Sequence, residues 1–178
     1  MNVLIIDNFF DCPEEVVEQS LDLNYNCSKD IDSGWQGYRT GRLEPSPVEE
    51  KILHAVSNHF QISDHNIESY YHILPTEVIH WDAQWDPATR VKDYHSYKYH
   101  ADPVPYAGVV YLSDAPDNCG TSIINGEKNQ IISYPHKYNR LIAYPGYYVH
   151  APTSPYGNDI TDGRLTYNFF ISQTFYGF

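Results

Sequence analysis

The 178-residue sequence has few cysteines, and their arrangement excludes two classes of small protein. Cys12, Cys27 and Cys119 are an odd number, and none of them forms a CxxC spacing. A disulfide framework and a structural zinc knuckle are therefore not expected. Free thiols fit a reducing compartment best, so we expect a cytoplasmic protein.

Basic residues are also scarce, with 11 lysines and arginines against 23 acidic residues and a formal net charge of -12. A surface with this charge repels phosphate backbones, so no nucleic-acid partner is expected. A peptide or a small molecule is the expected partner, and the sequence leaves the oligomeric state open. The first residues, "MNVLIIDNFF", lack a basic start and include Asp7, which argues against a secretion signal and a membrane span.

Aromatic residues, by contrast, are abundant: they make up 15% of the chain and include 17 tyrosines, while only 19% of residues are charged. This composition is typical of a folded, β-rich protein and not of a disordered chain. The length fits one domain over residues 1–178. We expect a mainly helical N-terminal part over about 1–75 and a β core over about 76–173.

Two helices are predicted in the N-terminal part. In "DCPEEVVEQSLDL", after the short apolar strand "VLIID", Asp11 is placed to cap a helix whose first turn contains Pro13. In "SPVEEKILHAVSNHF", Ser46 and Glu49 form a capping box. An apolar stripe on this second helix predicts that it packs on a core; its members are Ile52, Ala55, Val56 and Phe60. Residues 24–45 predict a loop with at most one short strand.

From about residue 76 onwards, short apolar or alternating runs are separated by Pro, Gly, Asn and Asp. β-branched and aromatic residues dominate these runs, which is typical of an antiparallel sandwich or barrel. The runs are "EVIHWDAQW", "AGVVYLS", "TSIIN", "NQIISY", "NRLIAYPG", "YYVHAP" and "RLTYNFFISQ". The sequence therefore predicts a β-sandwich buttressed by the preceding helices.

Three side chains in this part could bind one metal ion. His100 and Asp102 are two residues apart, so in extended backbone they point to the same side. His150 follows at the end of "LIAYPGYYVHAP". Two histidines and one carboxylate are the set that holds non-haem Fe(II) while leaving coordination positions open.

The last predicted strand has two different faces. Alternation places Arg164, Thr166 and Asn168 on one face, and the apolar residues Leu165, Tyr167, Phe169 and Ile171 on the other. Such a strand fits a barrel wall that is apolar under the helices and polar around a ligand.

The order H-x-D, "YLS", a Gly-Thr turn, "YPG", a distal histidine and Arg-x-Thr resembles the 2-oxoglutarate and Fe(II)-dependent dioxygenases, most closely the prolyl-4-hydroxylase-like branch. The resemblance implies a mainly β (α+β) double-stranded β-helix, or jelly roll. It implies Fe(II), 2-oxoglutarate and O2 as cofactor and cosubstrates, with iron bound by His100, Asp102 and His150. The residues that it assigns to 2-oxoglutarate are Arg164, Thr166 and Tyr111.

Several other residues have competing interpretations. His80 and Asp82 in "HWD" form a rival H-x-D pair, which we expect to line the mouth of the pocket. His136 is expected at the surface, and Gly120 and Gly146 in tight turns. The remaining histidines considered are expected to be solvated or hydrogen-bonded and not to bind metal; they are His54, His59, His65 and His72.

Two alternatives stay open. Arg39 and Arg42 in "GYRTGRL" could contact a substrate or only solvent. A cupin-like jelly roll that binds a metal or a small acid without oxidising anything is the competing function. The resemblance favours a hydroxylase that releases succinate and CO2, and it leaves the substrate, a prolyl or other peptide or a small molecule, unassigned.

Overall fold

The computed structural model describes residues 1–30, 35–63, 65–78, 99–126, 128 and 130–173. Within these ranges the elements, in chain order, are β1 (Leu4–Ile6), α1 (Pro13–Leu21), β2 (Tyr25–Cys27), β3 (Tyr38–Thr40), α2 (Pro47–Phe60), β4 (His65–Leu74), β5 (Tyr106–Tyr111), a 3-10 turn (Asp117–Cys119), β6 (Thr121–Asn125), β7 (Gln130–Tyr134), β8 (Leu141–Pro145), β9 (His150–Pro152) and β10 (Arg164–Gln173). Among the described helices, none is long and apolar enough to cross a membrane.

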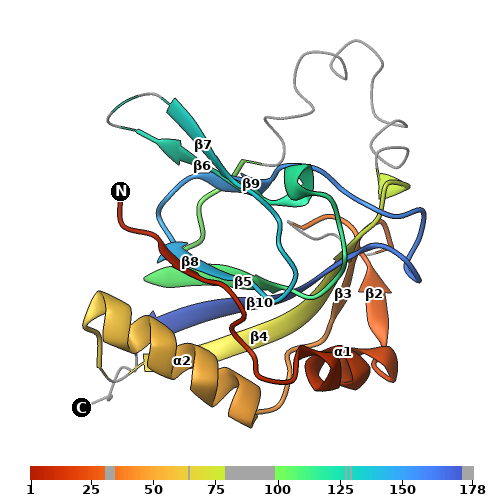
Figure 1. Cartoon of the computed structure of the whole chain (residues 1–178), viewed down its shortest axis with the longest axis horizontal. Helices are drawn as coiled ribbons and strands as arrows, with labels where there is room; N and C mark the ends of the chain where they lie inside the picture. The colour runs from red at the N-terminus through yellow and green to blue at the C-terminus, as the bar shows by residue number, and fades with distance from the viewer. Residues whose placement is uncertain (31–34, 64, 79–98, 127, 129, 174–178) are drawn as a thin grey trace.

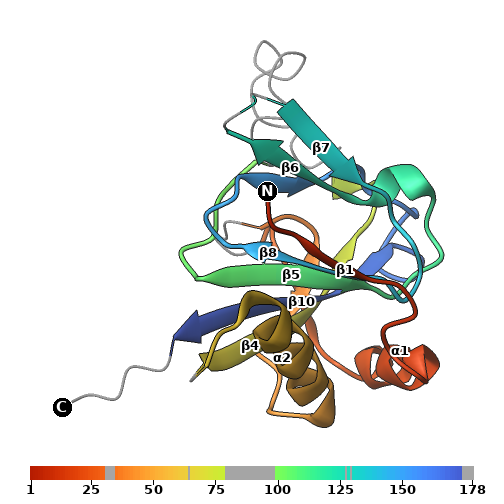
Figure 2. The same cartoon turned by 60° about the vertical axis from the view of Figure 1, so that its left-hand side comes forward.

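The strands form two antiparallel sheets that lie one above the other (Figure 1, Figure 2). The larger sheet has the order β1-β8-β5-β10-β4-β3-β2, and the smaller sheet has the order β7-β6-β9. The chain crosses repeatedly between the sheets, because β8 and β10 belong to the larger sheet while β9, which lies between them in sequence, belongs to the smaller one. This arrangement confirms the predicted mainly β jelly roll.

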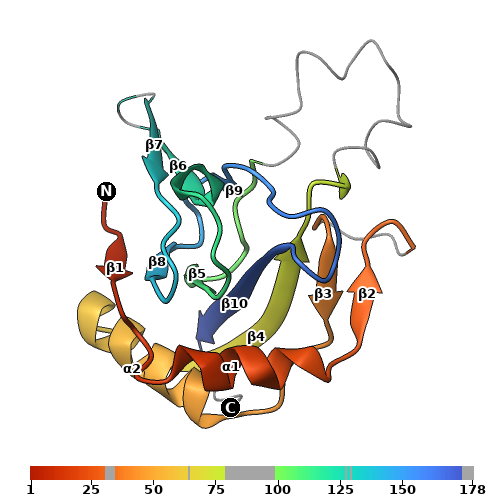
Figure 3. The same ribbon diagram turned by 45° about the vertical axis from the view of Figure 1, so that its right-hand side comes forward.

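Both helices cover the outer face of the larger sheet (Figure 3). Ile52 and Val56 of α2 are fully buried there, in one cluster with α1 residue Val16. The β10 side chains predicted to face the helices belong to the same cluster: Leu165, Tyr167, Phe169 and Ile171. The two-faced pattern of the last strand therefore matches the structure.

The Ser46 cap of the second helix is confirmed, but the Glu49 side chain accepts from Ser69 Oγ and does not complete the capping box. The Glu49 N–H donates to Ser46 Oγ at 3.4 Å, and Pro47 occupies the first turn. The predicted cap of the first helix is wrong. The first helix instead begins after Cys12, whose side chain makes no capping bond. The Asp11 carboxylate is engaged elsewhere, in an ion pair with Lys51 of α2 at 2.7 Å.

The division into a helical half and a β half is also wrong in one respect. Strand β4 lies within the part predicted to be helical, and it pairs with all ten residues of β10. Ile67, Tyr71 and Ile73 of β4 pack in the cluster under the helices, whereas Tyr70 and His72 face the other way. Polar residues at alternate positions concealed this strand, because they break up the apolar run. Strands β2 and β3 extend the same sheet.

The first predicted strand of the β core, residues 77–85, lies mostly outside the described residues. Its two described members, Glu77 and Val78, are not in a strand.

Truncation of the buried helix side chain tests how much this packing contributes. Ile52→Ala should lower the free energy of unfolding by about 2 to 5 kcal/mol, because it leaves a cavity between α2 and the sheet. His54→Ala, an exposed position on the same helix, should change it by less than about 0.5 kcal/mol. Urea unfolding followed by circular dichroism measures both. Equal, small effects would show that α2 does not pack as described.

Candidate metal centre

The segments that contain the two candidate histidines are joined through their backbones. The His100 N–H donates to the His150 carbonyl at 3.0 Å, and the His150 N–H donates to the His100 carbonyl at 2.8 Å. This reciprocal pair is an isolated antiparallel bridge next to β9. It brings two residues that are far apart in sequence to directly opposite positions, so their side chains can meet.

Asp102 is attached to a different connection. Its N–H donates to the carbonyl of Gly146, in the turn after β8, at 2.9 Å. A Cβ at Gly146 would lie 2.1 Å from the carbonyl oxygen of Val104, so this close approach of two backbones requires glycine. The predicted tight turn at Gly146 thus also positions the carboxylate.

The three side chains converge as predicted. His100 Nε2 lies 3.6 Å from Asp102 Oδ1, and His150 Nε2 lies 3.4 Å from Asp102 Oδ2. One ligand atom from each residue lies within 4.8 Å of the other two. Ligands at right angles around an ion with bonds of about 2.1 Å are about 3 Å apart, so a small contraction would complete the set. The residues therefore fit a metal of the Fe(II) or Mn(II) type.

The ring of His150 is oriented for coordination. Its Nδ1 lies 2.8 Å from the Tyr148 carbonyl, which can only accept, so Nδ1 is the protonated nitrogen. The lone pair on Nε2 is then directed towards Asp102. Burial lowers the pKa of His150, which keeps the ring neutral as a metal ligand requires.

The site is closed on one side and open on the other. The side chains of His150 and Asp102 are 8% and 12% exposed, whereas that of His100 is 49% exposed. The ring of Tyr144 packs 4.6 Å from that of His150 on the buried side. A metal held here would therefore have protein on one side and room for further ligands on the side of His100.

The other histidines lie elsewhere. In the described part of the chain, His100, Asp102 and His150 form the only grouping suited to a metal ion. The rival pair His80 and Asp82 lies outside the described residues. The predicted non-ligands His54, His59, His65 and His72 are not in the grouping.

The surface location predicted for His136 is wrong. Its side chain is 2% exposed, its Nε2 donates to the Ser113 carbonyl at 2.8 Å, and its ring packs 4.6 Å from that of Tyr111. The flanking polar turn suggested a surface position, but the backbone turns the ring inwards.

Arg164 is a buried cation on the inner face of β10, the face that looks towards the smaller sheet. It is 3% exposed. Its Nε donates to the Cys119 carbonyl at 2.5 Å and its Nη2 to the Gly120 carbonyl at 3.2 Å. Its Cζ lies 5.2 Å from the centre of the Tyr111 ring. Within the described ranges, no carboxylate pairs with it. Burial lowers the pKa of Arg164, because the interior disfavours a charge that has no partner.

Tyr111 and Thr166, the other two residues assigned to 2-oxoglutarate, are directly opposite each other on β5 and β10. Thr166 Oγ1 donates to Asn168 Oδ1 at 2.7 Å, and the Tyr111 hydroxyl bonds Thr121 Oγ1 at 2.7 Å. The structure thus brings Arg164, Thr166 and Tyr111 together on the inner face. Their contact with a ligand stays a prediction.

Sequence reasoning missed the contribution of β4 to this face. His72 is opposite Thr166, and its carbonyl, 3.3 Å from Thr166 Oγ1, is the more distant of two alternative acceptors for that hydroxyl. Burial lowers the pKa of His72 to about 4, so it is neutral. The signal that could have revealed it is the alternation of Ile67, Ser69, Tyr71 and Ile73 with more polar residues.

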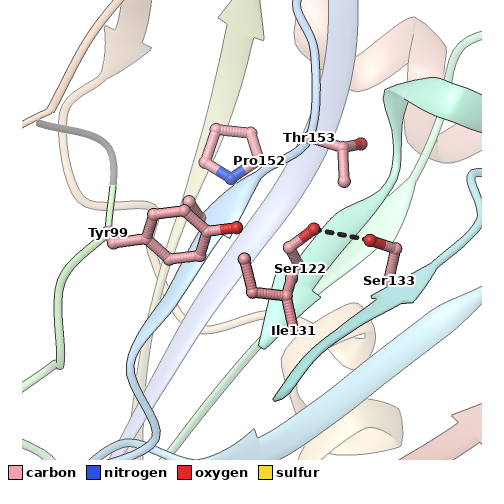
Figure 4. A pocket seen from close by; sticks show the side chains of 7 residues that line it. Tyr99, Ser122, Ile131, Ser133, Pro152 and Thr153 are labelled. Carbon is pink, nitrogen blue, oxygen red and sulfur yellow. Dashed lines mark hydrogen bonds between the residues drawn. The ribbon is translucent and has the colours of Figure 1, made fainter. Parts of the chain in front are cut away.

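A hollow of about 380 Å³ lies beside the histidine segments, on the outer face of the smaller sheet (Figure 4). Ser122 and Ser133 bond each other there at 2.8 Å, and Tyr99, next to His100, lines the same space. The hollow therefore lies on the side of β6 opposite to Ile123, which packs in the interior.

Comparison with known proteins supports the fold but not the sequence family. No family model matches the sequence, and no significantly similar curated protein was found. Solved structures match over almost the whole chain.

An oxidoreductase of the 2OG-Fe(II) oxygenase family from Burkholderia pseudomallei matches with a TM-score of 0.65 and 13% identity over 97% of this chain and 85% of that chain. A Pseudomonas putida prolyl-4-hydroxylase matches with a TM-score of 0.64 and 11% identity over 97% and 93% of the two chains. HygX from Streptomyces hygroscopicus, solved with nickel and 2-oxoglutarate, matches with a TM-score of 0.59 and 14% identity over 98% and 84%. The chain therefore has the jelly-roll fold of 2OG-Fe(II) oxygenases.

Removal of any one of the three candidate ligands should abolish tight metal binding. His100→Ala, Asp102→Ala and His150→Ala should each weaken Mn(II) binding by more than about 100-fold, because the loss of even an outer-shell partner costs about 10 to 100-fold. His54→Ala is the matched control, since His54 is exposed on α2. Mn(II) titration followed by electron paramagnetic resonance measures this. A variant that binds Mn(II) like the parent would remove that residue from the site.

Proposed function

We propose that this protein is an Fe(II)- and 2-oxoglutarate-dependent dioxygenase that hydroxylates an unactivated C–H bond of a prolyl or other peptidyl substrate or of a small molecule. The observation that carries the proposal is the half-open His100, Asp102 and His150 grouping in a jelly roll whose inner face also holds a buried arginine without a carboxylate partner among the described residues. The structural neighbours that bear the names prolyl-4-hydroxylase and 2OG-Fe(II) oxygenase support the same class.

The three ligands would hold Fe(II) through two neutral imidazoles and one carboxylate. Bound iron, together with 2-oxoglutarate and O2, supplies the oxidising power for hydroxylation, and succinate and CO2 leave. The hydrogen bond from His150 Nδ1 to the Tyr148 carbonyl holds the ring in the tautomer that can ligate. Because the His100 side chain is exposed, the substrate would approach the metal from the side of His100.

Arg164 is proposed to bind the distal carboxylate of 2-oxoglutarate. A buried charge is stable when it is paired, and a carboxylate would pair with this guanidinium in the water-poor interior. The carbonyls of Cys119 and Gly120 fix the plane of the guanidinium, so its position is set before the ligand arrives. Thr166 and Tyr111 are the neighbouring hydroxyl groups proposed to contact the same carboxylate.

The location and partners are also proposals. Cys12, Cys27 and Cys119 are free thiols in the structure, which agrees with the cytoplasmic location we propose. A peptide or a metabolite remains the proposed partner. The strongly acidic composition argues against a nucleic-acid partner. We also propose that the protein does not associate with membranes.

Succinate release tests the activity directly. The protein with Fe(II), 2-oxoglutarate and O2 should form succinate, and a substrate in a panel of peptides and metabolites should raise the rate and gain one oxygen atom by mass spectrometry. Asp102→Ala is the inactive control. Metal binding without any succinate, with or without the panel, would favour the cupin-like binding module instead.

Replacement of Arg164 should affect 2-oxoglutarate more than the metal. Arg164→Ala should weaken 2-oxoglutarate binding by about thirty-fold or more, since a charge-assisted bidentate bond is lost. Arg164→Lys should restore only part of it, because lysine has the charge but not the planar fork. Titration of 2-oxoglutarate into the anaerobic Fe(II) protein measures both, with Mn(II) binding as the control. If Arg164→Ala binds like the parent, the arginine is structural.

A further inference from the structure

A second arginine lies on the inner face of the larger sheet. Arg39 is in β3, directly opposite His72 of β4, which is in turn opposite Thr166 of β10, and Thr166 is opposite Tyr111 of β5. These four residues form one row across neighbouring strands. Because strands are about 4.8 Å apart, Arg39 lies about 10 Å along the sheet from Thr166.

Aromatic rings hold the Arg39 guanidinium in place. Its Cζ lies 3.7 Å from the centre of the Tyr70 ring, 5.3 Å from that of Phe170 and 5.8 Å from that of Trp35. Contacts of this kind stabilise a cation through the ring face and restrict the plane of the guanidinium. Ring faces accept no conventional hydrogen bond, so these contacts do not satisfy the Nε–H group.

One donor of Arg39 is unused within the described part of the chain, although the Tyr70 side chain also hydrogen-bonds the guanidinium. Its Nε is buried and has no hydrogen-bond partner, and no carboxylate there lies within 4.0 Å of its nitrogens. A desolvated donor without an acceptor is destabilising, and more so when it is charged. Arg42, three residues on, differs: it is exposed and pairs with Glu68 at 3.3 Å.

Arg39 is on the same side of the sheet as the metal ligands. Burial lowers its pKa, while Tyr70 and the Asp102 carboxylate oppose this change, so the charge of Asp102 acts on Arg39. The neighbouring Tyr38 packs in the cluster under the helices, so the Arg39 side chain lies on the opposite, inner face of the sheet.

We infer that Arg39 binds an oxyanion, a carboxylate or a phosphate, of the substrate that is oxidised, and that Trp35, Tyr70 and Phe170 pack against the adjoining part of that substrate. That the bound molecule is the substrate rests on the proposed function; the oxyanion site itself does not. The two arginines then have separate tasks: Arg164 holds the cosubstrate, and Arg39 selects an anionic substrate. The planar fork of arginine suits both oxyanions.

The test uses three small aromatic probes of similar shape: benzoate, phenyl phosphate and the uncharged benzamide. Each is titrated by ligand-observed NMR into metal-free protein and into protein loaded with Mn(II) and saturating 2-oxoglutarate, which occupies Arg164. At least one anion should bind the parent more tightly than benzamide. Which of the two binds tighter identifies the oxyanion.

Variants assign the binding to Arg39. Arg39→Met keeps the length of the side chain and should weaken anion binding by about tenfold or more. Arg39→Lys should retain part of it, and Arg42→Met should bind like the parent. Near-ultraviolet circular dichroism checks that each variant is folded. If Arg39→Met fails to fold, the Arg39→Lys comparison with Arg42→Met decides.

The inference would be overturned if benzamide bound as tightly as both anions, or if no probe bound at all. It would also be overturned if Arg39→Met bound the anion like the parent, or if Arg164→Met lost anion binding and Arg39→Met did not. A different outcome is that the metal-free protein binds the anion through Arg39 but binds neither Mn(II) nor 2-oxoglutarate. It would contradict the proposed function and leave the oxyanion site standing.

Discussion

The pairing of β10 with both β4 and β5 is the constraint on which the site depends. All ten residues of β10 have partners on β4, and six have partners on β5. Because side chains alternate, this register places Leu165, Tyr167 and Phe169 under the helices and Arg164 and Thr166 inside. A slip of the register by one residue would exchange the two faces of β10. The apolar side chains would then face the ligand side of the sheet, and Arg164 would be buried among apolar residues under the helices.

Energetic and functional roles are therefore divided between the two faces of one sheet. The outer face buries large apolar and aromatic side chains against α1 and α2, where the hydrophobic effect stabilises the fold. The inner face accepts costly features, including a buried guanidinium and a neutral buried histidine. Such features are typical of binding sites, where a ligand provides the missing partner.

Much of this could be predicted from residue pattern. The Ser46 cap and the alternation in β10 are local signals, and the structure agrees with both. The H-x-D pair and the later His150 are found as a motif, and their side chains converge. The failures have physical causes. Strand β4 was concealed by polar residues that serve the inner face, and the direction of His136 depends on a turn whose neighbours lie on other strands. The geometry that joins His100 to His150 is a long-range backbone bridge, so no window of sequence contains it.

The central claim is that a metal ion held by His100, Asp102 and His150 and 2-oxoglutarate held by Arg164 bind together in this protein. Anaerobic addition of Fe(II) and 2-oxoglutarate, followed by visible absorption spectroscopy, tests it most directly. We predict a weak charge-transfer band that requires both additions and is absent in His150→Ala, because the cosubstrate must chelate iron held by the protein. Tight binding of both components to the parent without such a band would contradict the account.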